Sequence, residues 1–158
     1  FDALLFAADR VDHCYREILP KLEKGYLVIS DRYRDSSYIY QSVQSQDQGD
    51  TSVDLAWIKT INKNSLDPDL TLIIDIDPEV SLHRRLKQNQ AQSMDIEKFE
   101  KLEFQRKIRQ KFLEIAEEKE NTPYDRHIVL DGSRSKEELF YEIIKIILSE
   151  GEFGSFGL

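Results

Sequence analysis

The chain has 158 residues, of which 40% are hydrophobic, and this is enough for one domain with a core of ordinary size. A formal net charge of -8 argues against broad attraction to nucleic acid or to an anionic membrane, so any anion site must be a local cluster of cations. The single cysteine, Cys14, can form no internal disulfide, and the sequence shows neither a membrane-spanning apolar run nor a signal-peptide pattern. We therefore expect a cytoplasmic protein that needs no membrane and no nucleic-acid partner.

The first third of the chain predicts a helix, a strand and a second helix. Apolar residues recur at three- and four-residue steps over residues 4–22, the spacing of one helix face, with Pro20 as a source of a kink and Gly25 as a C-terminal stop. The continuous apolar run YLVIS, residues 26–30, predicts a strand buried on both faces, as parallel sheets require. The next helix is predicted from about Ser36 onward.

The rest of the chain alternates between helices and strands. The predicted elements are a helix over 55–62, a strand over 70–76, a helix from Pro78, a long amphipathic helix over 96–119, a strand over 127–131, and a final helix over 136–149 with a Ser135/Glu138 capping box. The polar tract KQNQAQSMD predicts a surface loop or lid over about 87–96. This alternation indicates an α/β fold with a parallel sheet, in one domain over 1–150, followed by a tail over 151–158 without periodicity.

The Asp31-Arg32 pair directly follows the first predicted strand, where ligands bind in open parallel sheets. An aspartate at this position could hold a hydrated magnesium ion, and the planar fork of an arginine matches phosphate oxygens. An ion pair that closes the strand end explains the same two residues equally well. Beyond the pair, Tyr40 and Gln41 offer polar groups to a ligand at the head of the next helix, whereas Ser36 is better explained as a helix cap.

Phe6 and Arg10 lie four residues apart and so share one helix face. A ring and a guanidinium side by side could stack on and hydrogen-bond a planar base. The more common explanation of this spacing is a core phenylalanine beside a surface arginine that pairs with Asp9 or Asp12.

Two further groups of ionisable residues bear on ligand binding. Arg84 and Arg85 lead into the polar tract and could cover a nucleotide. The three histidines are not at metal-ligand spacing, so no zinc site is expected.

Four segments together resemble thymidylate kinases: LLFAADR, DRYRDSSYIYQ, PDLTLIIDIDPEVSLHRR and FEKLEFQRKIRQKFLEIA, the last with a character typical of archaeal members. The order and spacing of these separate motifs, from about Phe1 to Glu150, make the resemblance specific. It implies a nucleoside monophosphate kinase-like fold of the P-loop NTPase type, with three layers and a parallel sheet flanked by helices. It also implies ATP-dependent phosphorylation of dTMP to dTDP, the use of Mg²⁺, and a homodimer.

Residue by residue, the resemblance implies two nucleotide sites. On the dTMP side, Phe6 would stack on thymine, Arg10 read the base edge, Arg32 bind the phosphate, Ser37 and Gln41 contact the base, Tyr40 lie near the deoxyribose, and Glu100 lie at the pocket rim. On the ATP side, Arg84 would pack on adenine with Arg85 beside it, the loop Asp131, Gly132 and Ser133 would border that adenine, and Asp31 would lie near the magnesium ion. The residues expected to act in catalysis are Arg32 and Asp31.

Two departures from the family pattern bear on these implications. The glycines never frame a GxxxxGK[ST] phosphate loop, and the lid reads Asp95-Ile96 where many bacterial members carry Asp-Arg. In the family the phosphate loop and two strands, one of them central, precede the segment at Phe1. We therefore expect an N-terminal portion beyond these residues, and do not expect 1–158 alone to fold stably or to turn over. Two alternatives stay open: another nucleoside or nucleotide kinase of the same fold, or a nucleotide-binding module without catalysis.

Overall fold

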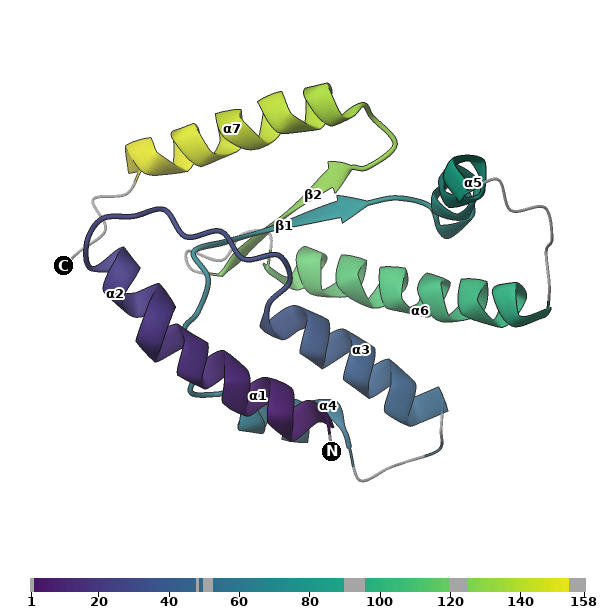
Figure 1. Cartoon of the computed structure of the whole chain (residues 1–158), viewed down its shortest axis with the longest axis horizontal. Helices are drawn as coiled ribbons and strands as arrows, with labels where there is room; N and C mark the ends of the chain where they lie inside the picture. Colours follow the sequence, from purple (N-terminus) through teal and green to yellow (C-terminus); the bar gives the residue numbers. More distant parts are fainter. Residues whose placement is uncertain (1, 48, 50–52, 90–95, 120–124, 154–158) are drawn as a thin grey trace.

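The computed structural model describes residues 2–47, 49, 53–89, 96–119 and 125–153 (Figure 1). In chain order the elements are α1 (Asp2–His13), a π-helical turn (Cys14–Ile18), α2 (Leu19–Leu22), α3 (Arg34–Asp47), α4 (Leu55–Ile61), β1 (Leu70–Asp75), α5 (Pro78–Asn89), α6 (Ile96–Lys119), β2 (Arg126–Asp131) and α7 (Lys136–Phe153). The described part of the chain is therefore mostly helical, and its two strands form a single pair.

The predicted first helix is present, but it contains a π-helical turn. The backbone N–H of Leu19 donates to the carbonyl of Cys14, five residues back, because the chain carries an extra residue in this turn. Pro20 directly follows and has no N–H to donate to an earlier carbonyl, which makes a regular ladder impossible here. The helix ends as predicted, since Gly25 has φ +78° and its N–H donates to the carbonyl of Leu22 at 2.8 Å.

The two strands form a parallel ladder, which confirms that part of the fold prediction. Leu70 pairs with Arg126 at one end and Asp75 with Asp131 at the other, so the carboxyl ends of both strands lie at the same edge. Helix α6 packs against β2 and β1 on one side, while α7 runs along the opposite side in Figure 1. This arrangement gives helices on both faces of a small parallel sheet.

The strand predicted over 26–30 is wrong for this structure. The segment is extended, but it forms no ladder with β1 or β2, which are the two strands of the sheet in the described part of the chain. Leu27 and Ile29 remain 68% and 78% exposed, so the apolar run lacks the cover that a buried strand needs. An apolar run reports a preference for burial, whereas a strand also requires a neighbour with free backbone groups.

Two boundaries also differ from the predictions. Residues 87–89 of the expected lid belong to α5, and Ile96 already begins α6; the rest of the lid, 90–95, lies outside the described residues. At the C-terminus α7 continues to Phe153, so the start of the predicted tail is helical, and 154–158 lie outside the described residues. The predicted capping box is confirmed, because Ser135 N–H donates to Glu138 at 3.0 Å and Glu138 N–H donates to Ser135 at 3.2 Å.

The hydrophobic core joins α3 to α6. Ile39, Val43 and Ile108 are at most 3% exposed and form its centre, with partly buried aromatic and aliphatic side chains around them: Tyr40, Phe104, Phe112 and Ile115. Ile39 and Val43 thus supply the packing face of α3. This packing fixes the direction in which the polar residues of α3 point. Among the described helices, none is both long enough and apolar enough to cross a bilayer.

Candidate functional site

Arg10 is held between two other helices. From α1, its Nη1 donates to Asn62 Oδ1 directly after α4, and its Nη2 donates to Ser37 Oγ in α3 at 2.7 Å. Both partners are buried, at 1% and 6% exposure. Burial lowers the pKa of Arg10, while the neighbouring phenols of Tyr33 and Tyr38 act in the opposite direction. The guanidinium therefore has a fixed place among three helices, rather than the freedom of a surface side chain.

These contacts decide between the two explanations of the Phe6/Arg10 spacing. Phe6 is 57% exposed and so is not a core residue, and Arg10 is half-buried on Asn62 and Ser37 rather than paired with Asp12, which instead contacts Arg16 at 2.6 Å. The common explanation, a core ring beside a surface ion pair, is wrong. The geometry leaves an exposed aromatic ring one helical turn from an anchored guanidinium, which suits a planar ligand.

The phenol ring of Tyr33 lies against the guanidinium of Arg10. The Cζ atom of Arg10 lies 5.8 Å from the ring centroid of Tyr33, a cation–π distance. The Tyr33 hydroxyl donates to the carbonyl of Leu66 at 2.9 Å, and Cys14 Sγ lies 2.8 Å from the same oxygen. Burial raises the pKa of Tyr33, and the contact with Cys14 acts in the same direction, so this hydroxyl stays protonated. The ring is thus locked in place under the guanidinium.

Arg32 also contacts α3, through Tyr40. Its φ is +65°, in the left-handed region that non-glycine residues rarely adopt, and its carbonyl accepts a hydrogen bond from Ser30 Oγ at 2.9 Å. Its Cζ lies 5.1 Å from the ring centroid of Tyr40. Strained backbone of this kind persists where surrounding structure or function requires it. Because Ser37 and Tyr40 are three residues apart on α3, the two arginines reach one face of that helix.

A cavity of about 770 Å³ lies beside Arg32, between the extended segment, β1, α6 and α7. Its walls are largely apolar, with Leu27, Ile29, Ile74 and Ile143 among the lining residues, and Asp31 and Arg85 add charge. Asp31 is exposed, and among the described residues it forms no ion pair with Arg32. The closing ion pair at the strand end is therefore not formed, and Asp31 borders the cavity.

Gln41, predicted as a base contact, has a distinctive feature. Its Oε1 is buried and accepts no hydrogen bond from the described residues. A buried polar atom of this kind costs free energy unless a partner satisfies it. Gln41 lies four residues after Ser37 on α3, next to the Arg10 contact, so a ligand with a hydrogen-bond donor would complete it.

Arg84, predicted to pack on adenine, contacts the loop after β2. Arg84 donates to the carbonyls of Gly132 at 2.9 Å and of Ser133 at 2.6 Å. Asp131 Oδ1 accepts from the N–H of Ser133 at 2.9 Å, and hydrogen bonds from the side chain and the N–H of Ser133 lower the pKa of Asp131. Gly132 fits against the end of β1, where its N–H donates to the Asp75 carbonyl at 2.6 Å. The loop is thus fixed to both α5 and the sheet.

Arg109 occupies the carboxyl edge of β1 and was not singled out from the sequence. Its Nε and Nη2 donate to the two oxygens of Asp75 at 2.7 and 2.9 Å, and its Nη1 contacts Asp77 at 3.2 Å. This bidentate geometry raises the pKa of Arg109. Arg109 also lines the cavity at the edge where ligands bind in parallel sheets, and its charge is balanced there by Asp75 and Asp77.

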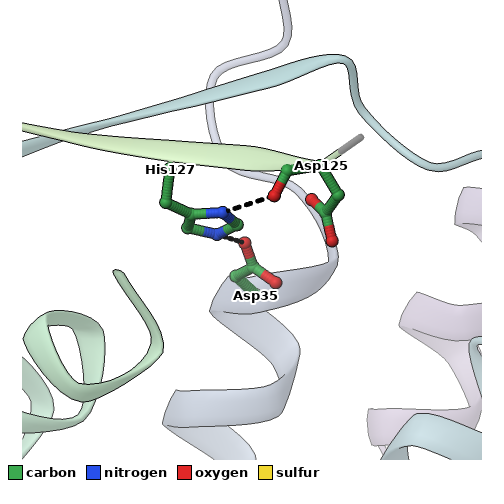
Figure 2. Close-up of side chains that lie close together, drawn as sticks. All are labelled: Asp35, Asp125 and His127. Carbon is green, nitrogen blue, oxygen red and sulfur yellow. Dashed lines mark hydrogen bonds and ion pairs between the residues drawn. The ribbon is translucent and has the colours of Figure 1, made fainter. Parts of the chain in front are cut away.

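A buried charge network connects α3 to the start of β2 (Figure 2). His127 is 1% exposed; its Nε2 lies 2.8 Å from Asp35 Oδ2, and its Nδ1 lies 2.9 Å from the carbonyl of Asp125. Arg34 Nη2 and Lys119 Nζ both donate to Asp125 Oδ2. Burial would raise the pKa of Asp35, but the hydrogen bond and charge of His127, together with the charges of Lys119 and Arg34, lower it.

The same three side chains, Asp35, Asp125 and His127, are close enough to share a metal ion, since their ligand atoms lie within 4.8 Å of one another. Two observations argue against that use. The Asp125 oxygen already accepts from two cationic side chains, and His127 Nε2 is already engaged by Asp35. Histidine spacing along the sequence could not reveal the cluster, because its members come from two segments more than ninety residues apart.

The family model for thymidylate kinase matches residues 1–143. The chain belongs to the thymidylate kinase family. Similar proteins include probable thymidylate kinases from Methanosarcina barkeri, 38% identical over 148 residues, and Pyrobaculum aerophilum, 41% identical over 146 residues. A thymidylate kinase from Carboxydothermus hydrogenoformans is 37% identical over 145 residues. The matches cover 93%, 92% and 90% of this chain, but 67%, 67% and 64% of those proteins, so the chain spans about two thirds of the length of the relatives.

The family assignment confirms the resemblance on which the site residues were named. Of those residues, Glu100 lies outside the part of the chain whose side chains are described, and the others are placed as given above. The sequence assigns no role to Asn62 or Tyr33, and the charged pattern around Arg109 is typical of a solvated helix face. Nothing in the spacing of Asn62 indicates a contact with Arg10.

Proposed function

We propose that this thymidylate kinase family member transfers the γ-phosphoryl group of ATP to dTMP, giving dTDP. The observation that carries the proposal is the convergence of two arginines on one face of α3, Arg10 at Ser37 and Arg32 at Tyr40. A nucleoside monophosphate has a base at one end and a phosphate at the other. Two cations that contact residues three positions apart on α3 can address both ends at once.

Each residue near α3 has a role in this proposal. Phe6 stacks on thymine, and Arg10 donates to the base carbonyl. Gln41 pairs with the base edge, which would satisfy its buried Oε1. Arg32 binds the phosphate, and Tyr40 limits the space at the deoxyribose. Glu100 belongs to the rim of the same pocket.

ATP is proposed to bind after the carboxyl end of β2, on Arg84, Arg85 and the loop Asp131, Gly132 and Ser133. The contacts of Arg84 with the loop carbonyls support this placement, because they make the side chain and the loop one rigid surface. The transfer itself needs alignment of two polyanions and neutralisation of their charge more than covalent help. Arg32 is the proposed charge-neutralising residue.

Magnesium is the metal that this reaction requires in the proposal. Asp31 offers a hard oxygen ligand, is exposed beside the cavity and is not engaged by Arg32, so its chemistry fits a hydrated Mg²⁺. When bound, the ion would neutralise phosphate charge. Residues 1–150 would form the nucleoside monophosphate kinase-like domain of the P-loop type, in a cytoplasmic homodimer.

Substitution of each arginine tests the separate roles proposed for Arg10 at the base and Arg32 at the phosphate. Arg32→Ala should reduce kcat/KM for dTMP by about a thousandfold, because a phosphate contact strengthened in the transition state is lost. Arg10→Ala should instead reduce the preference for dTMP over dCMP, whose amino group replaces the base carbonyl. The measurement is a coupled kinase assay with dTMP, dUMP, dCMP and AMP, on the protein as its gene encodes it.

Three results would count against the proposal. Equal turnover of the four monophosphates would favour another nucleotide kinase of the same fold. ATP binding without any phosphoryl transfer would favour a module without catalysis. Equal effects of Arg10→Ala on dTMP and dCMP would contradict the assigned role of that residue.

A further inference from the structure

Asn62 occupies a position that the proposed base-reading role of Arg10 depends on. It is 1% exposed and follows the last turn of α4, where its backbone carbonyl accepts from Ser65 N–H at 3.0 Å and Ser65 Oγ at 2.7 Å. Its Nδ2 donates to the carbonyl of Ile58 at 2.8 Å. The amide is therefore fixed at both its side-chain and its main-chain ends.

The orientation of that amide follows from chemistry. Because Nδ2 faces the Ile58 carbonyl, Oδ1 is the atom that faces Arg10 Nη1 and accepts its hydrogen bond. The reverse orientation would set an NH₂ group against the guanidinium and a carbonyl oxygen against a carbonyl, leaving four groups unsatisfied. Asn62 thus presents a single, directed acceptor to a buried cation.

Two acceptors are needed to fix a guanidinium plane. Ser37 alone holds Nη2, and the planar group could still rotate about that one bond. The Asn62 contact on Nη1 removes this freedom, while each terminal nitrogen retains a second hydrogen for a ligand.

We propose that Asn62 is a specificity-determining positioning residue that aims Arg10 at the carbonyl of a thymine base. The inference rests on the proposed function and extends it to the residue directly after α4, which is given no ligand contact in that proposal. Without the Asn62 acceptor, Arg10 would still be charged and near the site, but it would no longer discriminate between a carbonyl and an amino group at the base edge.

Two substitutions isolate the acceptor. Asn62→Leu and Asn62→Asp are close in size to asparagine, and both lose the donor to Ile58, but only the leucine variant loses the oxygen that faces Arg10. Asp54→Ala is the matched structural control, because the Asp54 side chain accepts from Trp57 N–H at 2.7 Å and caps α4 without contacting Arg10. All three substitutions weaken one end of α4, but only Asn62→Leu removes the acceptor that orients Arg10.

The experiment is a calorimetric titration of wild type and the three variants with dTMP and with dCMP, alongside urea unfolding of each protein. Asn62→Leu should lose about tenfold of the preference for dTMP over dCMP, as expected for a hydrogen bond to a charged group. Asn62→Asp and Asp54→Ala should keep that preference within about threefold.

Each outcome is decisive. An unchanged preference in Asn62→Leu would overturn the inference alone, and so would a loss in Asp54→Ala as large as that in Asn62→Leu. A wild-type protein that does not prefer dTMP would overturn the proposed function, and the inference with it.

Discussion

Adding a single methyl group at Gly132 should weaken ATP binding and leave dTMP binding nearly unchanged. A Cβ added there would lie 2.7 Å from the Asp75 carbonyl oxygen and 2.9 Å from Ile74 Cγ2, against 3.4 Å or more for an ordinary contact. The loop would have to move by about 0.7 Å. It cannot do so freely, because Gly132 N–H donates to that same oxygen at 2.6 Å.

The expected cost follows from these contacts. Forcing an extra methyl group into packed structure costs about 1–3 kcal/mol, and the loss of one hydrogen bond adds about 1 kcal/mol. We expect Gly132→Ala to lower the free energy of unfolding by about 3 kcal/mol. Since Arg84 binds the carbonyls of Gly132 and Ser133, the displaced loop should also raise KM for ATP while leaving KM for dTMP nearly unchanged.

Urea unfolding, followed by the fluorescence of the single tryptophan Trp57, measures the first effect, and initial rates at varied ATP and dTMP measure the second. Gly25→Ala is the control, because Gly25 has φ +78° but no atom within 4 Å of its added Cβ. It should cost about 1–2 kcal/mol from backbone strain alone. If Gly132→Ala proved no more destabilising than Gly25→Ala, or if it raised both KM values equally, the steric reasoning would be refuted.

The buried charge network gives two further predictions. Asp35 has a lowered pKa in the folded protein, so its pairing with His127 stabilises the fold above the ordinary aspartate pKa and is lost as the pH falls below about 4. Asp35→Asn should therefore flatten the dependence of the unfolding free energy on pH between about pH 5 and pH 2, and an unchanged slope would contradict this. Arg34→Met should cost about 3 kcal/mol in urea unfolding, because it removes a cation from buried Asp125. Arg106→Met, whose ion pairs are exposed, should have little effect, and an equal loss in the two variants would contradict the role of burial.

The sequence by itself determined the local structure and the family. Periodicity, capping signals and Pro78 at a helix start depend on neighbouring residues, so they located most helices and β1 and β2 to within a few residues. The motif series around Arg32 and Arg84 identified the family for the same reason, because short strings of residues carry it. These features need no knowledge of what packs against them.

Only the tertiary structure decided which side chains meet. Arg10 could not be assigned to Asn62 from the sequence, since the two are 52 residues apart, and the cluster of Asp35, Asp125 and His127 spans a still longer separation. The segment over 26–30 failed as a predicted strand because pairing is a property of two segments, and its apolar run describes only one. Hydrogen-bond partners, burial and charge neutralisation depend on the packing of distant helices, and that packing converts a list of polar residues into a site.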